Sequence, residues 1–252
     1  MEVILAKTAG FCYGVERAVE LAKRTAAEGG CVMLGSIIHN AAVVQELEAL
    51  GARTVEDVSQ IQPGETVVIR SHGEPVETYR ALEEKGARIV DATCPNVARI
   101  HQLVAKAEAE GRTPLIIGEA HHPEVLAAAS RSPHSVILEG PEELEKWLAE
   151  RPERREMPLL AVAQTTCIQT IWQNAQKILK KECTNAEIFD TICLATHKRQ
   201  TEAAELAAKV DVMVVVGDRK SANTKHLTEI SRMRCPRSEE RRVGKECRSR
   251  WS

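Results

Sequence analysis

The chain has 252 residues with a formal net charge of −2, and 43% of them are hydrophobic although aromatic residues make up only 3%. This length fits one large or two to three smaller α/β units whose cores consist of aliphatic side chains. The near-neutral charge argues against a nucleic-acid-binding protein, which usually carries a basic face. Met1 is followed by no basic segment with a long apolar run, and no stretch approaches about 18 apolar residues, so we expect a cytoplasmic protein without signal peptide or membrane span.

Short runs rich in β-branched residues alternate with amphipathic stretches, a pattern typical of α/β domains with parallel sheets. We expect strands at 2–6, 31–35, 66–70, 88–91, 114–117, 158–163, 186–190 and 211–216. We expect helices at 14–28, 41–50, 76–86, 96–110, 123–130, 168–181, 198–208 and 221–232. Residues 152–158 begin and end with proline and are expected to form a surface loop.

Chemically reactive residues follow almost every expected strand. In chain order these residues are Cys12, His39, His72, Cys94, His122 with Glu124, Thr165, Cys193 with Thr196, and Ser221 with Asn223. In open parallel sheets, ligands bind just beyond the carboxyl ends of the strands. We therefore expect these side chains to gather on one side of the sheets.

The eight cysteines are scattered and form no CxxC pair, which argues against a local zinc knuckle or a thioredoxin-type site. In a reducing compartment they should be free thiols. Cys12, Cys94 and Cys193 each sit in a turn after a strand, whereas Cys31, Cys167 and Cys183 are expected to be small buried hydrophobic residues. Three converging thiolates fit a 4Fe-4S cluster with one iron that lacks a protein ligand, and they also fit a zinc ion, so both remain open from spacing alone.

Three histidines at strand ends, His39, His72 and His122, predict a binding site for a phosphate or diphosphate beside helix N-termini. Glu124 lies in an expected first helical turn, where it either complements the helix dipole or serves as a buried proton donor. Ser221 is expected to cap the last helix, and such an N-terminus can also bind an anion. The remaining histidines, at positions 101, 121, 134, 197 and 226, are expected to have no role.

Eight motifs in this order resemble the LytB/IspH family of 4-hydroxy-3-methylbut-2-enyl diphosphate reductases. The motifs are AGFCYGVERAV, GSIIHN, RSHG, VDATCPNV, HHPEV, AQTT, DTICLATHKRQ and VVVGDRKSANTKHL, and they cover residues 1–236. The resemblance implies three α/β units around a central 4Fe-4S cluster, at 13–94, at 95–191, and at 1–12 combined with 192–236. It also implies a ferredoxin- or flavodoxin-like electron donor, and we see no flavin or nicotinamide site.

The resemblance assigns roles to the residues found at the strand ends. Cys12, Cys94 and Cys193 would hold the cluster, while Glu124 and Thr165 would contact the substrate hydroxyl, with Glu124 as its proton donor. The substrate-binding residues would be His39, His72, His122, Thr196, Ser221 and Asn223. The reaction would be the reductive dehydration of the allylic diphosphate to isopentenyl and dimethylallyl diphosphate.

The last residues, 237–252, are charged and nearly free of apolar side chains, and we expect them to form a non-native tail. Their start, Arg-Ser-Glu-Glu, equals one reading frame of a common sequencing adapter. The family's Gly/Ser-rich segment, which would supply another serine to the diphosphate, has no counterpart here, so we expect an incomplete third unit. Alternative functions are a non-redox iron–sulfur hydro-lyase, a zinc- or cluster-based sensor, and an inactive fragment of the reductase.

Overall fold

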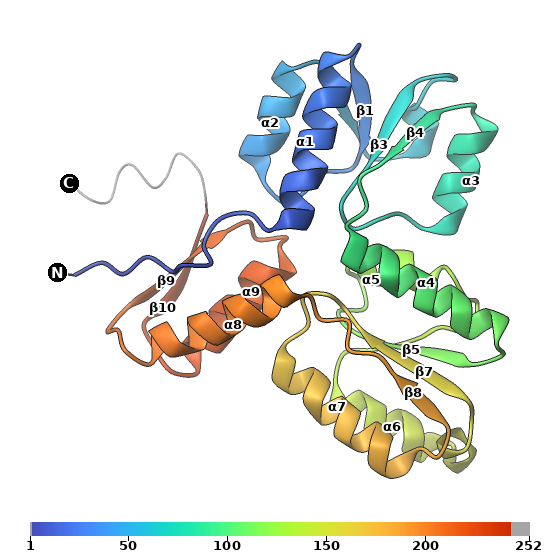
Figure 1. Ribbon diagram of the computed structural model, residues 1–252, viewed down its shortest axis with the longest axis vertical. Coiled ribbons are helices and arrows are strands. Elements are labelled where there is room, and N and C mark those ends of the chain that lie inside the picture. Colours follow the sequence, from blue (N-terminus) through green and yellow to red (C-terminus); the bar gives the residue numbers. More distant parts are fainter. Residues whose placement is uncertain (1, 243–252) are drawn as a thin grey trace.

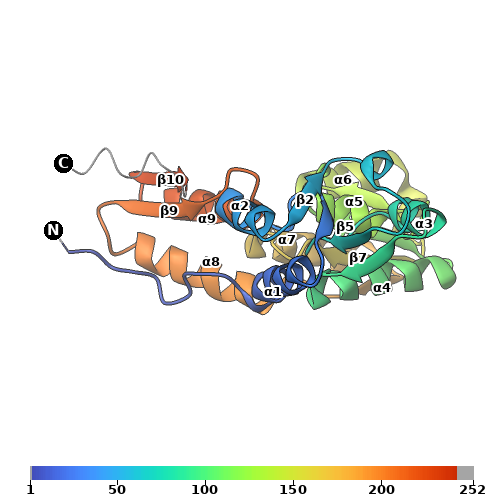
Figure 2. The ribbon, with the colours of Figure 1, turned by 90° about the horizontal axis from the view of Figure 1, so that it is seen from above.

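The computed structural model describes residues 2–242, which form three lobes around a common centre (Figure 1). Each lobe has its own sheet, and every strand pair in these sheets is parallel. Seen from above, the lobes lie beside one another in a flat molecule (Figure 2). The predicted fold class, α/β with parallel sheets, is confirmed.

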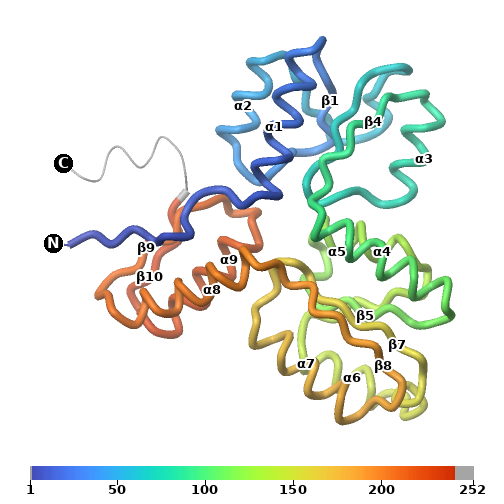
Figure 3. The backbone as a smooth tube through the Cα atoms, in the orientation of Figure 1, coloured from blue at the N-terminus to red at the C-terminus, as the bar shows by residue number. Residues whose placement is uncertain are grey.

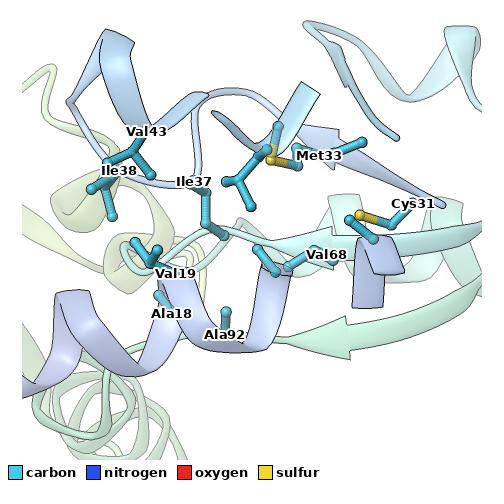
Figure 4. Packing of buried hydrophobic residues seen from close by; sticks show 13 residues of the cluster. Ala18, Val19, Cys31, Met33, Ile37, Ile38, Val43, Val68 and Ala92 are labelled. Carbon is cyan, nitrogen blue, oxygen red and sulfur yellow. The ribbon is translucent and has the colours of Figure 1, made fainter. Parts of the chain in front are cut away.

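The first lobe contains a four-stranded sheet in the order β2-β1-β3-β4. Its elements are α1 (Tyr13–Ala27), β1 (Cys31–Leu34), α2 (Ala41–Ala49), β2 (Ala52–Val55), η1 (Val58–Gln60), β3 (Thr66–Ile69), α3 (Val76–Glu84) and β4 (Arg88–Asp91). Met33 of β1 packs with Ala18 and Val43, from α1 and α2 (Figure 4). Val32 and Leu34 point to the opposite face and pack in the cluster that includes Leu82 of α3. Because both faces are covered, polar ligands can reach this sheet only at its edges or strand ends.

The second lobe repeats this architecture with the strand order β6-β5-β7-β8. Its elements are α4 (Pro95–Ala109), β5 (Thr113–Ile117), α5 (Pro123–Ala129), β6 (Val136–Leu138), α6 (Pro141–Glu150), η2 (Pro152–Arg155), β7 (Leu159–Ala163), α7 (Gln169–Glu182) and β8 (Ala186–Ile188). Leu115 and Ile117 pack with Trp172 of α7, while Ile116 packs with Val104 of α4 on the other face. The alternation of β5 side chains between two apolar clusters explains why the whole strand is hydrophobic.

The third lobe contains α8 (Leu194–Ala207), β9 (Met213–Gly217), α9 (Ala222–Arg232) and β10 (Ser238–Arg242). Its sheet has two strands within the described residues, and Val214 and Val216 of β9 are about half exposed. Residues Ser238–Arg242 belong to the expected non-native tail, and they form strand β10 of this lobe. Parallel pairing with β9 uses only backbone groups, so a charged sequence can supply the strand. Residues 243–252 of the expected tail lie outside the described part of the chain.

The N-terminal segment runs alongside the third lobe (Figure 3) but forms no strand within 2–6, where one was expected. The side chain of Glu202 on α8 accepts hydrogen bonds from the backbone N–H groups of Lys7 and Thr8, at 2.6 and 2.8 Å. Arg199 donates to the carbonyl oxygens of Thr8 and Gly10. Helix side chains therefore satisfy these backbone groups in place of a neighbouring strand.

Several short elements were not expected from the sequence. These elements are β2, η1, β6, α6, η2 and β10, and η2 lies inside the expected loop at 152–158. The helix expected at 198–208 begins four residues earlier, at Leu194. No helix between residues 2 and 242 is long and apolar enough to cross a lipid bilayer. The three-unit boundaries at 13–94, 95–191 and 1–12 with 192–236 stay a prediction.

Candidate active site

Three helices begin at the cysteines that were expected to hold a metal centre. Cys12, Cys94 and Cys193 are the N-cap residues of α1, α4 and α8. These helices belong to three different lobes, and each thiol lies at the positive end of a helix dipole. Helix N-termini attract negatively charged groups, so these positions suit thiolates that are bound to iron or zinc.

Local contacts show how these thiols are placed. The Sγ of Cys193 lies 3.4 Å from the backbone nitrogen of Thr196 and 3.1 Å from its Oγ1. Burial raises the pKa of the Cys94 thiol, hydrogen bonds from the first turn of α4 oppose this, and the nearby charges of Cys12 and Cys193 raise it further. Cys12 and Cys193 are therefore near enough to Cys94 for their charges to act on its thiol. A positive centre among them would remove the repulsion between thiolates, so the donor set fits a metal or an iron–sulfur cluster.

The other described cysteines are placed differently. Cys31 and Cys167 are buried in the cores of the first and second lobes, and Cys183 packs against the second core. Burial raises the pKa of Cys167 to about 12. Their expected role as small hydrophobic residues therefore fits their surroundings.

His39, His72 and His122 form one compact group. The ring centroids of His39 and His72 are 4.7 Å apart, those of His72 and His122 are 5.4 Å apart, and those of His39 and His122 are 6.2 Å apart. His39 precedes the N-cap of α2, His72 follows β3, and His122 is the N-cap of α5. Two lobes therefore contribute to this histidine triad.

The triad is buried in a way that keeps its rings neutral without a ligand. Burial lowers the pKa of His122 to about 4 and that of His72 well below its usual value, and the positive charges of neighbouring histidines and Arg70 contribute. The buried Nε2 of His39 and Nδ1 of His72 have no hydrogen-bond partner. Buried polar atoms without partners are costly and indicate that a ligand belongs there. The three ring nitrogens lie within 4.8 Å of one another, so they can contact one oxyanion or one metal ion.

Arg70 is a residue of this site that the sequence interpretation missed. Its Nε lies 2.6 Å from Oε1 of Glu74, and the Glu74 side chain is almost fully buried. Its positive charge contributes to the lowered pKa of all three histidines. Arg70 could have been identified from the sequence, because it is a basic residue directly after β3 and immediately before Ser71 and His72.

Glu124 and Thr165 form a buried pair in the second lobe. The backbone N–H of Thr165 donates to Oε1 of Glu124 at 2.6 Å, and the Thr165 hydroxyl donates to Oε2 at 2.7 Å. Burial raises the pKa of Glu124, although both hydrogen bonds from Thr165 oppose that shift. A carboxyl group with a raised pKa can hold a proton at neutral pH and deliver it to a substrate.

The third lobe brings the N-terminus of α9 to the triad. Ser221 caps this helix by accepting a hydrogen bond from the backbone N–H of Thr224, and Asn223 lies in the first turn. The charges of Asp218 and Lys220, just before the cap, act on His39. The segment just before Ser221 is therefore near His39, while the roles of Ser221, Asn223 and Thr196 in substrate binding stay predictions.

Comparison with known proteins identifies relatives over most of the chain. The family model described as LytB protein matches residues 3–246. The chain belongs to the LytB family. The resemblance found from the eight motifs is therefore confirmed.

Named relatives of this LytB chain agree with one another. A protein from Geobacter sp. (strain M21), "4-hydroxy-3-methylbut-2-enyl diphosphate reductase", is 40% identical over 240 residues, covering 94% of this chain and 83% of that protein. A protein of the same name from Caldanaerobacter subterraneus subsp. tengcongensis is 36% identical over 245 residues, covering 93% and 82%.

Solved structures resemble the LytB chain as well. The E-1-hydroxy-2-methyl-but-2-enyl-4-diphosphate reductase from Plasmodium falciparum superposes with a TM-score of 0.85 at 27% identity, over 96% of this chain and 76% of that one. A second structure, of (E)-4-hydroxy-3-methyl-but-2-enyl diphosphate reductase, gives a TM-score of 0.70 at 34% identity, over 99% and 88%.

Two histidines of the LytB chain to which no role was assigned are buried in polar networks. His101 on α4 lies beside Arg131, with its Nδ1 at 3.3 Å from the guanidinium. His226 on α9 lies between Thr166 and Glu119. Their partners are distant in sequence, so no local pattern could have indicated these contacts.

Proposed function

We propose that this chain catalyses the reductive dehydration of 4-hydroxy-3-methylbut-2-enyl diphosphate to isopentenyl and dimethylallyl diphosphate. The observation that best supports this activity is the position of the buried Glu124–Thr165 pair. Glu124 lies two residues after His122, the residue that caps α5. The acidic Glu124 suits the hydroxyl leaving group of the substrate, and the anion-binding His122 beside it suits the diphosphate. Relatives with the names given above support this activity over other iron–sulfur chemistry.

Cys12, Cys94 and Cys193 would hold a 4Fe-4S cluster. Support comes from the three N-cap thiols and from the family, in which all the named relatives are reductases. When bound, such a cluster supplies electrons one at a time and an iron without a protein ligand, which acts as a Lewis acid. Helix dipoles from α1, α4 and α8 favour the negative charge that the centre carries.

The diphosphate would bind between the histidine triad and the N-terminus of α9. Imidazole N–H groups, the Ser221 hydroxyl and the Asn223 amide are hydrogen-bond donors for phosphate oxygens. Free N–H groups in the first turn of α9 and its dipole add to the attraction. Arg70 is partly buried, and its positive charge acts on all three histidines.

Glu124 would supply the proton that leaves with the hydroxyl oxygen as water. Burial raises the pKa of the carboxyl group and so favours its protonated form, and Thr165 fixes the orientation of both carboxyl oxygens. The overall change consumes two electrons and two protons per substrate and breaks one carbon–oxygen bond. A ferredoxin- or flavodoxin-like protein would deliver the electrons, and a reducing cytoplasm would keep the cysteines as free thiols.

Anaerobic turnover of the cluster-loaded protein tests the proposal. The substrate should yield the two isoprenoid diphosphates only when a one-electron donor is present, and mass spectrometry of the products would detect both. Product formation with no reductant would identify a non-redox hydro-lyase instead. Stoichiometric zinc with no acid-labile sulfide would contradict the cluster assignment.

A further inference from the structure

His226 links the third lobe to two loops of the second lobe. It lies on α9 and is buried, with 7% of its surface exposed. Its Nδ1 is 2.7 Å from the carbonyl oxygen of Thr166, and its Nε2 is 3.2 Å from Oε1 of Glu119. Thr166 follows Thr165, and Glu119 lies on the loop that leads to His122. One ring therefore contacts both loops that carry site residues of the second lobe.

The partners of His226 are both hydrogen-bond acceptors. A carbonyl oxygen only accepts hydrogen bonds, so Nδ1 must carry a hydrogen, and an ionised carboxylate requires the same of Nε2. Glu119 is ionised, because Lys225, His226 and His122 together lower its pKa although its partial burial pushes the pKa upwards. Both ring nitrogens therefore face hydrogen-bond acceptors, and the ring spans the two loops through one hydrogen bond from each nitrogen.

Other charged groups surround this contact. Lys225 places its Nζ 2.9 Å from the same oxygen of Glu119, and it also feels the charges of Glu139 and Glu229. Lys225 is more than half exposed, so water and salt screen its attraction to Glu119. His226 is shielded from water and should contribute more to the attachment of α9.

We propose that His226, hydrogen-bonded through both ring nitrogens to Thr166 and Glu119, is a positioning residue that fixes the N-terminus of α9 against the loop of His122. Ser221 and Asn223 precede His226 on the same helix, so its attachment sets their distance from the histidine triad. This inference rests on the proposed diphosphate site. Release of α9 would weaken diphosphate binding and leave the Glu124–Thr165 pair in place.

Binding of inorganic diphosphate to the cluster-loaded protein tests this role, measured by calorimetry together with KM and kcat. His226→Gln and Glu119→Gln should each raise the dissociation constant and KM about tenfold, the effect of one charged hydrogen bond, while kcat stays almost unchanged. Lys225→Met should have a smaller effect because its contact is exposed. His134→Gln, at an exposed position of the second lobe, is the matched control and should bind as the unmodified protein does.

A second measurement does not depend on substrate. Nitrogen-15 NMR of the histidine rings at neutral pH should give two N–H signals for His226, and Glu119→Gln should remove the Nε2–H signal. A single ring N–H in the unmodified protein, or unchanged diphosphate binding in both variants, would overturn the inference. His122→Asn is the reference variant: if it too leaves diphosphate binding unchanged, the proposed diphosphate site fails and this inference with it.

Discussion

Thr165 donates two hydrogen bonds to the carboxyl group of Glu124, one from its backbone nitrogen at 2.6 Å and one from its hydroxyl at 2.7 Å. Both residues are almost fully buried, so water does not compete with this pair. The carboxyl group is thereby held in one orientation while burial keeps its pKa raised.

Glu124→Gln should reduce kcat by at least about 100-fold, the usual contribution of a positioned proton donor. Glutamine has nearly the same shape but has no acidic proton to transfer. KM should change little, because the diphosphate contacts lie on other residues. Anaerobic turnover of cluster-loaded protein measures this effect, and full activity of the variant would contradict the proton role of Glu124.

Thr165→Val should move the pH dependence of kcat towards higher pH. The Thr165 hydroxyl lowers the pKa of Glu124, so its removal raises that pKa further, and the carboxyl group then stays protonated to a higher pH. One buried carboxyl oxygen also loses its partner, at a cost of about 1–3 kcal/mol in stability. Thr165→Ser keeps the hydroxyl and should retain the original profile, which separates this effect from a general loss of packing.

Diphosphate binding should take up protons. The histidine triad is neutral when free because burial lowers its pKa values, and an anion beside it raises them. Since the bound pKa values exceed the free ones, affinity should be highest at low pH and should fall as pH rises through the bound values. Calorimetry in buffers with different ionisation enthalpies measures this uptake, and His122→Asn should reduce it. Identical binding enthalpies in all buffers would show that the triad does not titrate with the ligand.

Cys193→Ser should lose the iron and acid-labile sulfide of the protein, because serine does not replace a thiolate ligand of such a cluster. Cys183→Ser is the matched control in the second lobe, since Cys183 packs against the core there at the C-terminal end of α7. Metal analysis and visible absorption after anaerobic reconstitution distinguish the two variants. Equal iron content in both would remove Cys193 from the cluster.

Gly14→Ala should impair cluster loading without unfolding the protein. A Cβ atom at Gly14 would lie 2.5 Å from the Sγ of Cys94, so α1 or the cysteine would have to move. Gly140→Ala is the control, because the nearest atom to its Cβ would lie at 3.4 Å. Iron content should fall only in the first variant, and circular dichroism should show the same helix content in both. Normal iron content in Gly14→Ala would mean that the site tolerates a shift of Cys94.

The fold class and the residues at strand ends could be predicted because both depend on local sequence patterns. Aliphatic runs such as 114–117 are hydrophobic along their whole length when both faces of the strand are buried. The start of α8 could not be placed, because the thiol of Cys193 caps this helix in place of the usual oxygen-bearing side chain. Short strands such as β2 and β6 depend on pairing with distant partners, which no local pattern records.

The sequence interpretation mainly missed contacts between residues that are distant in the sequence. His226 pairs with Glu119 and Thr166, which precede it by many residues, and Arg70 gains its importance only beside the assembled triad. The N-terminal residues 2–6 have the composition of a strand, yet the following residues bond to Glu202 on α8. In each case tertiary structure decides which of several possible partners a residue meets.

The placement of Cys12, Cys94 and Cys193 on three different lobes also affects how the protein matures. Cys12 leaves the ribosome long before Cys193 is made, so its thiol must stay reduced while the two later lobes are synthesised and fold. A fragment with one or two lobes has an incomplete ligand set whatever its own stability. Iron content should therefore report the assembly of the entire molecule, and it should be lost as soon as any one lobe opens.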